Sequence, residues 1–271
     1  ESIKGFHTDI SLKEFEKLLN ERGLVLIGQT KDIAPADKLI YALRDVTATI
    51  DSIPLITASI MSKKLAEGAN GIVMDIKTGT GAFMSKKSDA KKLAKSILNT
   101  ATRFDKNSVA LITNMDQPLG NAVGNALEII ESIEVLKGNG PKDLTELSLA
   151  LAAHMIHIGG VEATYSKALK AAKNSIKDGS ALNKFRELIK NQNGDETVID
   201  DYSRLPQAKS STEVLSQQTG WIKSFKCDQI GLLATELGGG RKVKTDKIDF
   251  GVGFIFHKKI GDKVKAGESI F

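Results

Sequence analysis

Short apolar runs alternate with amphipathic helical patterns through the first half of the chain. The apolar runs consist mainly of aliphatic residues bounded by glycine or polar residues, which indicates buried strands. We predict strands at 23–28, 71–76 and 108–113, and helices at 11–21, 36–44, 52–67 and 88–100. This alternation is typical of parallel α/β units, so it predicts the α/β fold class.

The second half has a different pattern. We predict helices at 122–136, 144–157, 167–177 and 183–191, and then short strands at 221–225, 250–257 and 260–264. Two predicted helices follow one another at 36–67, between the strands predicted at 23–28 and 71–76. A minimal crossover needs only one helix. We therefore predict that 36–67 belongs to a helical domain. The predicted organisation is an α/β domain at 1–35 and 68–210, a helical segment at 36–67, and a β-rich C-terminal α+β subdomain at 211–271.

The composition is that of an ordinary globular protein. Hydrophobic residues make up 41% and charged residues 26% of the 271 residues, which argues against disorder. The net charge is +5, but 38 basic residues are interleaved with 33 acidic ones and only 5% are aromatic, so we expect no nucleic-acid binding. The single Cys227 cannot form an internal disulfide, and no apolar run approaches the roughly 20 residues of a spanning helix. We therefore expect a cytoplasmic protein that binds no membrane.

The predicted helix at 52–67 carries the most informative polar residues. Ser52 precedes an Ile-Pro pair and is a typical helix start, because its hydroxyl can accept from a free amide of the first turn. Ser59 and Lys63 are four residues apart and share one face of a helix that is otherwise strongly apolar. A lysine in such surroundings needs an anionic or hydrogen-bonding partner.

That partner is not decided by the residues alone. Arg44 lies in the preceding predicted helix and gives the segment a second cation. For Arg44 and Lys63, a structural ion pair with Asp45 or Asp51 and a ligand site are both open.

Other motifs favour structural interpretations. Gly79-Thr80-Gly81 follows a predicted strand, but it lacks the dinucleotide and P-loop fingerprints, so we predict a tight turn. Asp75 and Asp116 lie at or beyond strand ends, where a cap or an ordinary ion pair is the favoured interpretation. The four histidines are dispersed, which argues against a catalytic zinc site.

Ten ordered segments extend along nearly the whole chain: 34–38, 41–49, 51–60, 63–68, 73–84, 116–126, 136–141, 143–147, 238–241 and 257–262. Together they resemble the core of the thymidine phosphorylases and pyrimidine-nucleoside phosphorylases. Such a series of matches in order is far more specific than any single motif. The resemblance implies a large mixed α/β domain with a partial helical domain, of the nucleoside phosphorylase and phosphoribosyltransferase type.

The resemblance also implies an activity. In this family, phosphate displaces a pyrimidine from the anomeric carbon of a nucleoside such as uridine, thymidine or deoxyuridine, and the products are the free base and a pentose 1-phosphate. The implied role is nucleoside salvage, with inorganic phosphate as co-substrate and no organic cofactor. A homodimer is implied for the full-length protein.

By the same resemblance, Arg44, Ser59 and Lys63 bind the base, and Arg44 and Lys63 are the catalytic residues. Negative charge grows on the departing pyrimidine, and preplaced cations in a dry pocket stabilise that charge. Ser59 can satisfy the ring imide or an adjacent carbonyl, which favours uracil or thymine over cytosine. We expect Asp45 to orient the two cations.

A potassium site is implied as well. Its ligands would be the main-chain carbonyls of Leu119 and Ala122 and the carboxylate of Glu131, and hard oxygen ligands suit such an ion. The residue pattern alone predicts Glu131 to be a solvated helix residue.

The chain departs from the family at its ends. It opens at Glu1 without Met, and the family's phosphate-binding glycine-rich segment lies upstream of the position where Glu1 aligns. We therefore expect a fragment that holds the base half of the site without the phosphate half and that is inactive in phosphorolysis alone. We also expect the C-terminal subdomain to be incomplete.

Two alternatives belong to other classes. An anthranilate-phosphoribosyltransferase-like activity should need an acidic metal-diphosphate site, and no convincing Asp-Glu pair is present. A non-catalytic binding module is suggested by 261–267, which resembles the turn of biotinyl and lipoyl carriers; without an acceptor lysine, a plain hairpin is the favoured interpretation. Preference for thymidine or tolerance of uridine depends on pocket shape, which these residues do not define.

Overall fold

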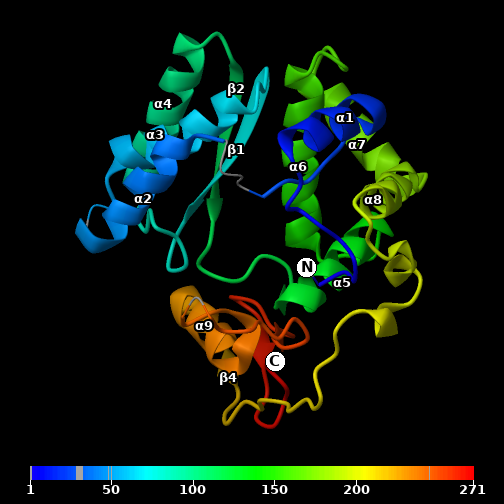
Figure 1. The fold of residues 1–271 in the computed structure, drawn as a ribbon. Helices are drawn as coiled ribbons and strands as arrows, with labels where there is room; N and C mark the ends of the chain where they lie inside the picture. The colour runs from blue at the N-terminus through cyan, green and yellow to red at the C-terminus, as the bar shows by residue number, and fades with distance from the viewer. Residues whose placement is uncertain (1, 29–32, 48, 50, 244) are drawn as a thin grey trace. The chain divides into compact units, whose positions relative to one another are not determined.

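The computed structural model describes residues 2–28, 33–47, 49, 51–243 and 245–271 (Figure 1). The chain divides into two compact units. The first consists of Glu1–His7, Met115–Leu147 and Asn174–Phe271, and the second of Thr8–Asn114 and Ser148–Lys173. The domain boundaries predicted after residues 35, 67 and 210 stay a prediction.

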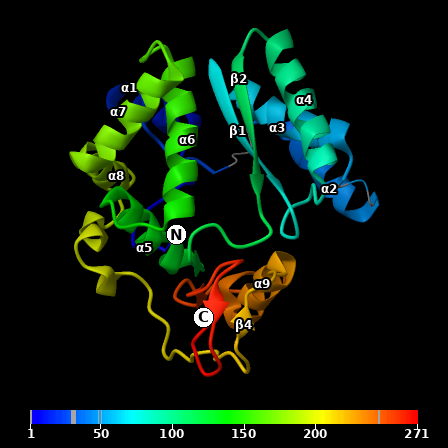
Figure 2. The ribbon, with the colours of Figure 1, turned by 180° about the vertical axis from the view of Figure 1, so that it is seen from behind.

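A parallel pair of strands lies at the centre of the second unit. β1 (Gly71–Thr78) pairs with β2 (Asn107–Asn114) in register from Gly71 opposite Asn107 to Thr78 opposite Asn114. Both strands were predicted and are confirmed, each a little longer than expected. The connection between them is α4 (Lys87–Arg103), which packs against β2 and β1 (Figure 2). A parallel pair needs such a crossover.

The helix α3 (Ile53–Ala66) packs on α4 and shares the core of this unit. Met61 of α3 is 1% exposed and Ile97 of α4 is fully buried, while Ile72 and Ile76 point from β1 into the same cluster. Burial of such side chains contributes about 1.5–3 kcal/mol each. Because one face of α3 packs into this core, the rotation of the helix is fixed, and the residues on its other face point away from the core.

The helices predicted at 11–21 and 36–44 are confirmed in this unit. α1 (Leu12–Arg22) begins after Ser11, whose hydroxyl accepts the Glu14 amide at 3.2 Å. α2 (Pro35–Thr47) begins with its proline at a position where no amide is needed. Ser52 precedes α3 as predicted, but its hydroxyl makes no capping hydrogen bond.

The predicted strand at 23–28 is wrong for the part of the chain that the structure describes. Gly28 donates its amide to the Thr8 carbonyl at 2.8 Å, but 24–28 forms no strand. Leu24 and Leu26 are 38% and 47% exposed. An apolar run becomes a strand only where a neighbouring strand accepts its backbone hydrogen bonds.

The first unit is mainly helical around its own core. Its core includes Ile3, Ala126, Ile133, Ile189, Val198, Ile199 and Leu205. The elements that supply it are α5 (Asn125–Leu136), α8 (Ser180–Asn191) and the 3-10 helices η1 (Glu196–Ile199) and η2 (Tyr202–Arg204). Two long helices are divided between the units by residue: α6 (Lys142–Ile158) belongs to the first unit up to Leu147, and α7 (Tyr165–Lys177) belongs to the second unit up to Lys173.

The predicted helix at 122–136 begins later than expected. Ala122 and Val123 form β3 (Ala122–Val123), which pairs antiparallel with β5 (Phe254–Ile255). Gly124 separates strand from helix with φ +147°, and a side chain there would meet the Val252 carbonyl oxygen at 2.5 Å. Glycine at this position therefore lets the backbone of Gly124 approach the backbone of Val252 closely. The hydrophobic pattern of the sequence does not reveal this approach.

The C-terminal part contains less strand than predicted. β4 (Gly220–Trp221) pairs antiparallel with β6 (Lys263–Val264), so 261–267 is not the plain hairpin that was favoured. The helix α9 (Cys227–Ala234) and the short π-helix η3 (Thr235–Gly239) were not predicted. Within the described residues, no helix is long and apolar enough to cross a membrane.

Candidate active site

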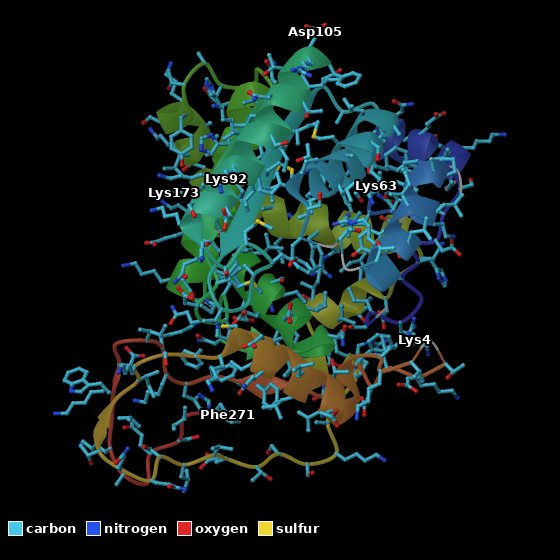
Figure 3. All side chains as sticks on the ribbon, turned by 90° about the vertical axis from the view of Figure 1, so that its left-hand side faces the viewer. Lys4, Lys63, Lys92, Asp105, Lys173 and Phe271 are labelled. Carbon is cyan, nitrogen blue, oxygen red and sulfur yellow. The ribbon has the colours of Figure 1, made fainter. Side chains whose placement is uncertain are left out.

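Ser59 and Lys63 form one contact on α3, as their spacing predicted. The Lys63 ammonium donates to the Ser59 hydroxyl oxygen at 3.1 Å and to the Asp37 carboxylate at 2.6 Å (Lys63 is labelled in Figure 3). Ser59 is 7% exposed and Asp37 is 8% exposed. The lysine therefore has the anionic partner that an apolar helix requires.

Asp37 is a residue that the sequence interpretation missed. It lies in the first turn of α2, where an acidic residue is ordinarily explained by the helix dipole. The predicted alternatives were Asp45 and Asp51. The Asp45 side chain lies outside the described part of the chain, and Asp51 is exposed at the turn before α3.

Arg44 and Lys63 both lie near the ring of Tyr41. Arg44 is 4% exposed, and its guanidinium carbon lies 5.3 Å from the centroid of the Tyr41 ring. The Lys63 ammonium lies 6.0 Å from the same centroid. Both separations are within the range of cation–π attraction. Three predicted site residues, Arg44, Ser59 and Lys63, therefore gather between α2 and α3.

The described groups of this cluster include charges of both signs. Arg44 and Lys63 are cationic and Asp37 is anionic, so these described groups carry a net charge of +1. The Lys63 and Asp37 side chains are 24% and 10% exposed, so solvent screens the pair only in part. The three groups therefore form a set of charges that is partly withdrawn from water.

The site is held in position by the core of the second unit. Thr57 donates its hydroxyl to Ser96 of α4 at 2.9 Å, and Met61 lies between Ser59 and Lys63 in sequence but points into the core. Ser59 and Lys63 thus lie on a helix whose rotation is fixed by buried contacts on both sides.

Glu131 is not the solvated helix residue that the residue pattern predicted. Its Oε1 accepts the amides of Asn121 at 2.7 Å and Ala122 at 3.1 Å. Burial raises the pKa of the Glu131 carboxyl, and these amides and the charge of Lys259 oppose that rise. Gly120 has φ +68°, and a side chain there would overlap Glu131 Oε2. Glu131 and the backbone of Ala122 are therefore adjacent.

The same loop binds a lysine from the C-terminal segment. The Lys259 ammonium donates to the carbonyls of Pro118 at 2.7 Å and of Gly120, and to the Asp143 carboxylate at 3.2 Å. The sequence offered a signal, because Lys259 lies in the family-like segment 257–262. Its partners are more than a hundred positions away and could not be read from that segment.

The remaining candidate motifs have structural contacts. Asp75 forms an ion pair with Lys77 at 2.6 Å and accepts the Thr113 hydroxyl at 2.5 Å, which confirms the ordinary ion pair predicted for it. Gly79 has φ +121° and its carbonyl accepts the Ala82 amide at 3.1 Å, which confirms the tight turn. No group of three or more His, Cys, Asp or Glu side chains among the described residues could hold a metal ion.

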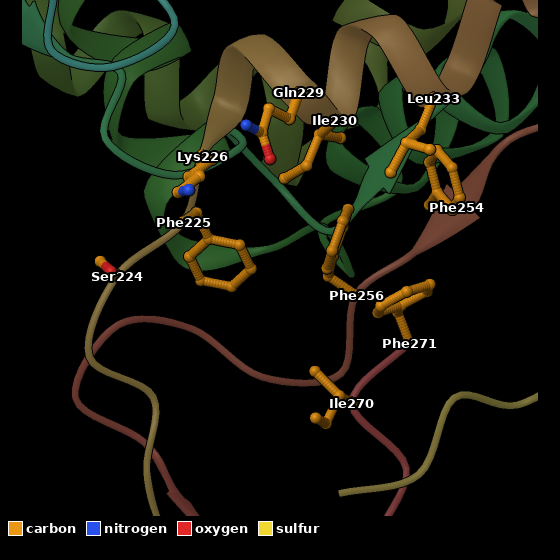
Figure 4. Close-up of a pocket in the computed structure, with 10 residues that line it drawn as sticks. All are labelled: Ser224, Phe225, Lys226, Gln229, Ile230, Leu233, Phe254, Phe256, Ile270 and Phe271. Atoms are coloured by element: carbon orange, nitrogen blue, oxygen red, sulfur yellow. The ribbon is translucent and has the colours of Figure 1, made fainter. Parts of the chain in front are cut away.

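The C-terminal segment of the first unit contains an apolar pocket of about 240 Å³ (Figure 4). Four phenylalanines dominate its wall: three of their rings contact one another pairwise and the fourth contacts one of these three, with centroids 5.3 to 6.1 Å apart. They are Phe225, Phe254, Phe256 and Phe271. All of its lining residues belong to the first unit, whereas Arg44, Ser59 and Lys63 belong to the second, so this pocket is not the site predicted from the sequence.

Two family models match the chain. The model described as "Glycosyl transferase family, a/b domain" matches residues 1–182. The model described as "Pyrimidine nucleoside phosphorylase C-terminal domain" matches residues 221–271. The first match covers α1 to α7 and hence the whole Arg44, Ser59 and Lys63 cluster.

Curated relatives match over the same length. The pyrimidine-nucleoside phosphorylase of Staphylococcus epidermidis is 47% identical over 270 residues, and those of two Staphylococcus aureus strains are 49% and 48% identical. Each alignment covers 100% of this chain and 62% of the relative. The chain thus spans less than two thirds of the length of these relatives. Because the first model matches well over half of the chain, the chain belongs to the glycosyl transferase family that this a/b domain defines.

Proposed function

We propose that this chain is the base-binding part of a pyrimidine-nucleoside phosphorylase acting on uridine, thymidine or deoxyuridine, with inorganic phosphate as co-substrate. The observation that carries the proposal is the convergence of Arg44 and Lys63 on the Tyr41 ring, with Ser59 in contact with Lys63. The identity of 47–49% to pyrimidine-nucleoside phosphorylases supports it along the whole chain. The proposed activity is that of the whole protein.

The geometry suits a leaving group that becomes anionic. A phosphate oxygen forms a bond to C1′ as the bond from C1′ to the pyrimidine nitrogen breaks, and the electron pair of that bond remains on the base. Its charge spreads to the ring carbonyls, where Arg44 and Lys63 can stabilise it. The sugar becomes oxocarbenium-like, and an anionic phosphate is matched to it. The base then takes up a proton.

Ser59 is proposed to recognise the edge of the base that carries the ring imide and its carbonyls. Its oxygen accepts a hydrogen bond from Lys63, so its own hydroxyl proton is directed elsewhere and can be donated to a carbonyl. Uracil and thymine present carbonyls on both sides of the ring imide, whereas cytosine presents an amino group on one side. This arrangement supports the uracil or thymine preference.

Asp37 is proposed as a positioning residue for the base site. Its carboxylate holds the Lys63 ammonium at 2.6 Å while the same ammonium contacts Ser59. A flexible four-carbon side chain is thereby restricted to one orientation before a base arrives, which reduces the entropy lost on binding. We also propose that Asp45 acts on the cations.

We further propose that Glu131 and the carbonyls of Leu119 and Ala122 hold a potassium ion. The donors are hard oxygens, and the amides of Asn121 and Ala122 hold the partly buried Glu131 carboxylate against this loop, which supports the proposal. Such an ion would supply fixed positive charge to this loop. A homodimer of the full-length protein and a cytoplasmic location complete the proposal, and the single Cys227 fits a reducing compartment.

The direct test is base binding by this chain. We expect uracil and thymine to shift the NMR signals of α2 and α3, and cytosine to bind more weakly. Lys63→Ala should weaken uracil binding at least about tenfold, since a charge-assisted contact in a partly buried site contributes about 1.5–3 kcal/mol.

Lys92→Ala is the matched control, because Lys92 also pairs with a carboxylate, Asp89 at 2.9 Å, but lies exposed on α4. It should leave uracil binding unchanged. Equal uracil affinity of the Lys63→Ala, Lys92→Ala and unmodified chains would remove Lys63 from the proposed site. Phosphorolysis of uridine, thymidine and cytidine by the full-length protein then tests the reaction itself.

A further inference from the structure

The loop at 118–122 is approached by carboxylates and by one ammonium group. Asp143 contacts the Gly120 amide at 3.3 Å, and Glu131 contacts the amides of Asn121 and Ala122. Lys259 enters from the opposite end of the sequence and contacts two carbonyls of the loop together with Asp143. The loop is therefore surrounded by charges of both signs.

The three acceptors of Lys259 match its three N–H groups. An ammonium has three donors and no acceptor, and here it has the carbonyls of Pro118 and Gly120 and the carboxylate of Asp143. Its side chain is 21% exposed, so much of its charge is withdrawn from water. Main-chain carbonyls and a carboxylate are hard oxygen donors, the same kind of donor as in the potassium site proposed for this loop.

The neighbouring backbone helps to hold Lys259 in place. The Ile260 amide donates to the Gln117 side chain at 2.9 Å, and the Phe256 amide donates to the Asn121 carbonyl at 2.7 Å. Residues on both sides of Lys259 are thus tied to both ends of the loop. These hydrogen bonds fix the backbone around Lys259, and so they position its ammonium at the loop carbonyls.

We propose that Lys259 is a built-in cation of the 118–122 loop and that it competes with potassium for this loop. The inference rests on the potassium site proposed above, and it is independent of base binding. Glu131 contacts the amides of the loop and Lys259 contacts its carbonyls, and the charge of Lys259 acts on the Glu131 carboxyl, so a metal cation held by Glu131, Leu119 and Ala122 would lie near the Lys259 ammonium. Two positive charges so close repel each other through a partly buried medium. Lys259 therefore supplies the positive charge when potassium is absent and weakens potassium binding when it is present.

The test compares thermal unfolding in KCl and in choline chloride at equal ionic strength. For the unmodified chain we expect a slightly higher midpoint in KCl than in choline chloride, because Lys259 weakens potassium binding without abolishing it. Lys259→Met should lower the midpoint in choline chloride, and KCl should restore it with a potassium affinity at least about tenfold tighter than that of the unmodified chain. Lys259→Gln, which keeps a donor for the carbonyls without the charge, should respond to KCl in the same direction.

Lys263→Met is the matched control, since the Lys263 ammonium lies 5.9 Å from the centroid of the Trp221 ring. It should respond to KCl as the unmodified chain does. Equal stabilisation by potassium in the unmodified chain and in Lys259→Met would overturn the proposal, and so would variants at 259 that stay destabilised or unfolded in KCl. Uracil binding by the unmodified chain is measured separately. Failure of the base-binding proposal can therefore be distinguished from failure of the proposal for Lys259.

Discussion

Replacing Asp37 by asparagine isolates the electrostatics of the proposed base site. The change removes one negative charge and preserves the size of the side chain. Asp37 lies 2.6 Å from the Lys63 ammonium, and the two side chains are 10% and 24% exposed. The net charge of the three groups, Asp37, Arg44 and Lys63, rises from +1 to +2. Ser59 and the core contacts of α3 are unaffected.

Two magnitudes follow from this geometry. Removing one partner of a buried ion pair costs about 3–5 kcal/mol, and we expect about 2 kcal/mol here because asparagine keeps an acceptor oxygen. A carboxylate about 6 Å from a bound anion opposes its binding by about 3 kcal/mol at an effective dielectric constant of about 20. Partial solvent screening reduces that figure, so we expect a selective gain for an anionic base of at least about tenfold.

The assay is the ratio of two affinities measured by NMR titration at neutral pH. One ligand is uracil, which is neutral, and the other is 5-nitrouracil, which is largely anionic. Loss of Lys63 positioning weakens both ligands, whereas loss of the Asp37 charge favours only the anion. The ratio of 5-nitrouracil affinity to uracil affinity therefore reports the charge alone.

Asp89→Asn is the control for this prediction, because Asp89 pairs with Lys92 at 2.9 Å on the exposed face of α4. It should leave the ratio unchanged. If Asp37→Asn also leaves the ratio unchanged while both ligands still bind, the base does not lie near the Asp37 carboxylate, and the placement argued from Lys63 and Tyr41 is refuted.

Two further predictions concern stability. Ile97 is fully buried between α4 and the strands, so Ile97→Ala should lower the free energy of unfolding by about 2–5 kcal/mol in urea titrations, whereas the exposed neighbour change Asn99→Ala should lower it by less than about 0.5 kcal/mol. Tyr202 donates to Glu134, and this hydrogen bond lowers the pKa of the Glu134 carboxyl below its ordinary 4.5. Its contribution is therefore present above pH 4.5 and is lost as the pH falls through the lowered pKa. Tyr202→Phe should thus be less stable than the unmodified chain at pH 7, with a difference that shrinks below pH 4.5; a difference that is constant with pH would contradict this assignment.

Local features of the sequence determined most of the helices and the central strand pair. Ser11 and Pro35 mark helix starts through the chemistry of their own side chains. The apolar runs at 71–76 and 108–113 are long enough and sufficiently β-branched to specify β1 and β2. The spacing of Ser59 and Lys63 placed both on one face of α3, because helical geometry depends only on separation along the chain.

Only the tertiary structure decided which charges meet. Asp37 pairs with Lys63 across two helices, and Lys259 reaches the carbonyls of Pro118 and Gly120 from 141 and 139 positions away. The run at 24–28 has the composition of a strand, but it pairs with no neighbouring strand in the described residues. Side-chain charge and backbone pairing act through space, so their partners depend on the packing of distant segments. Periodicity along the chain contains no information on that packing.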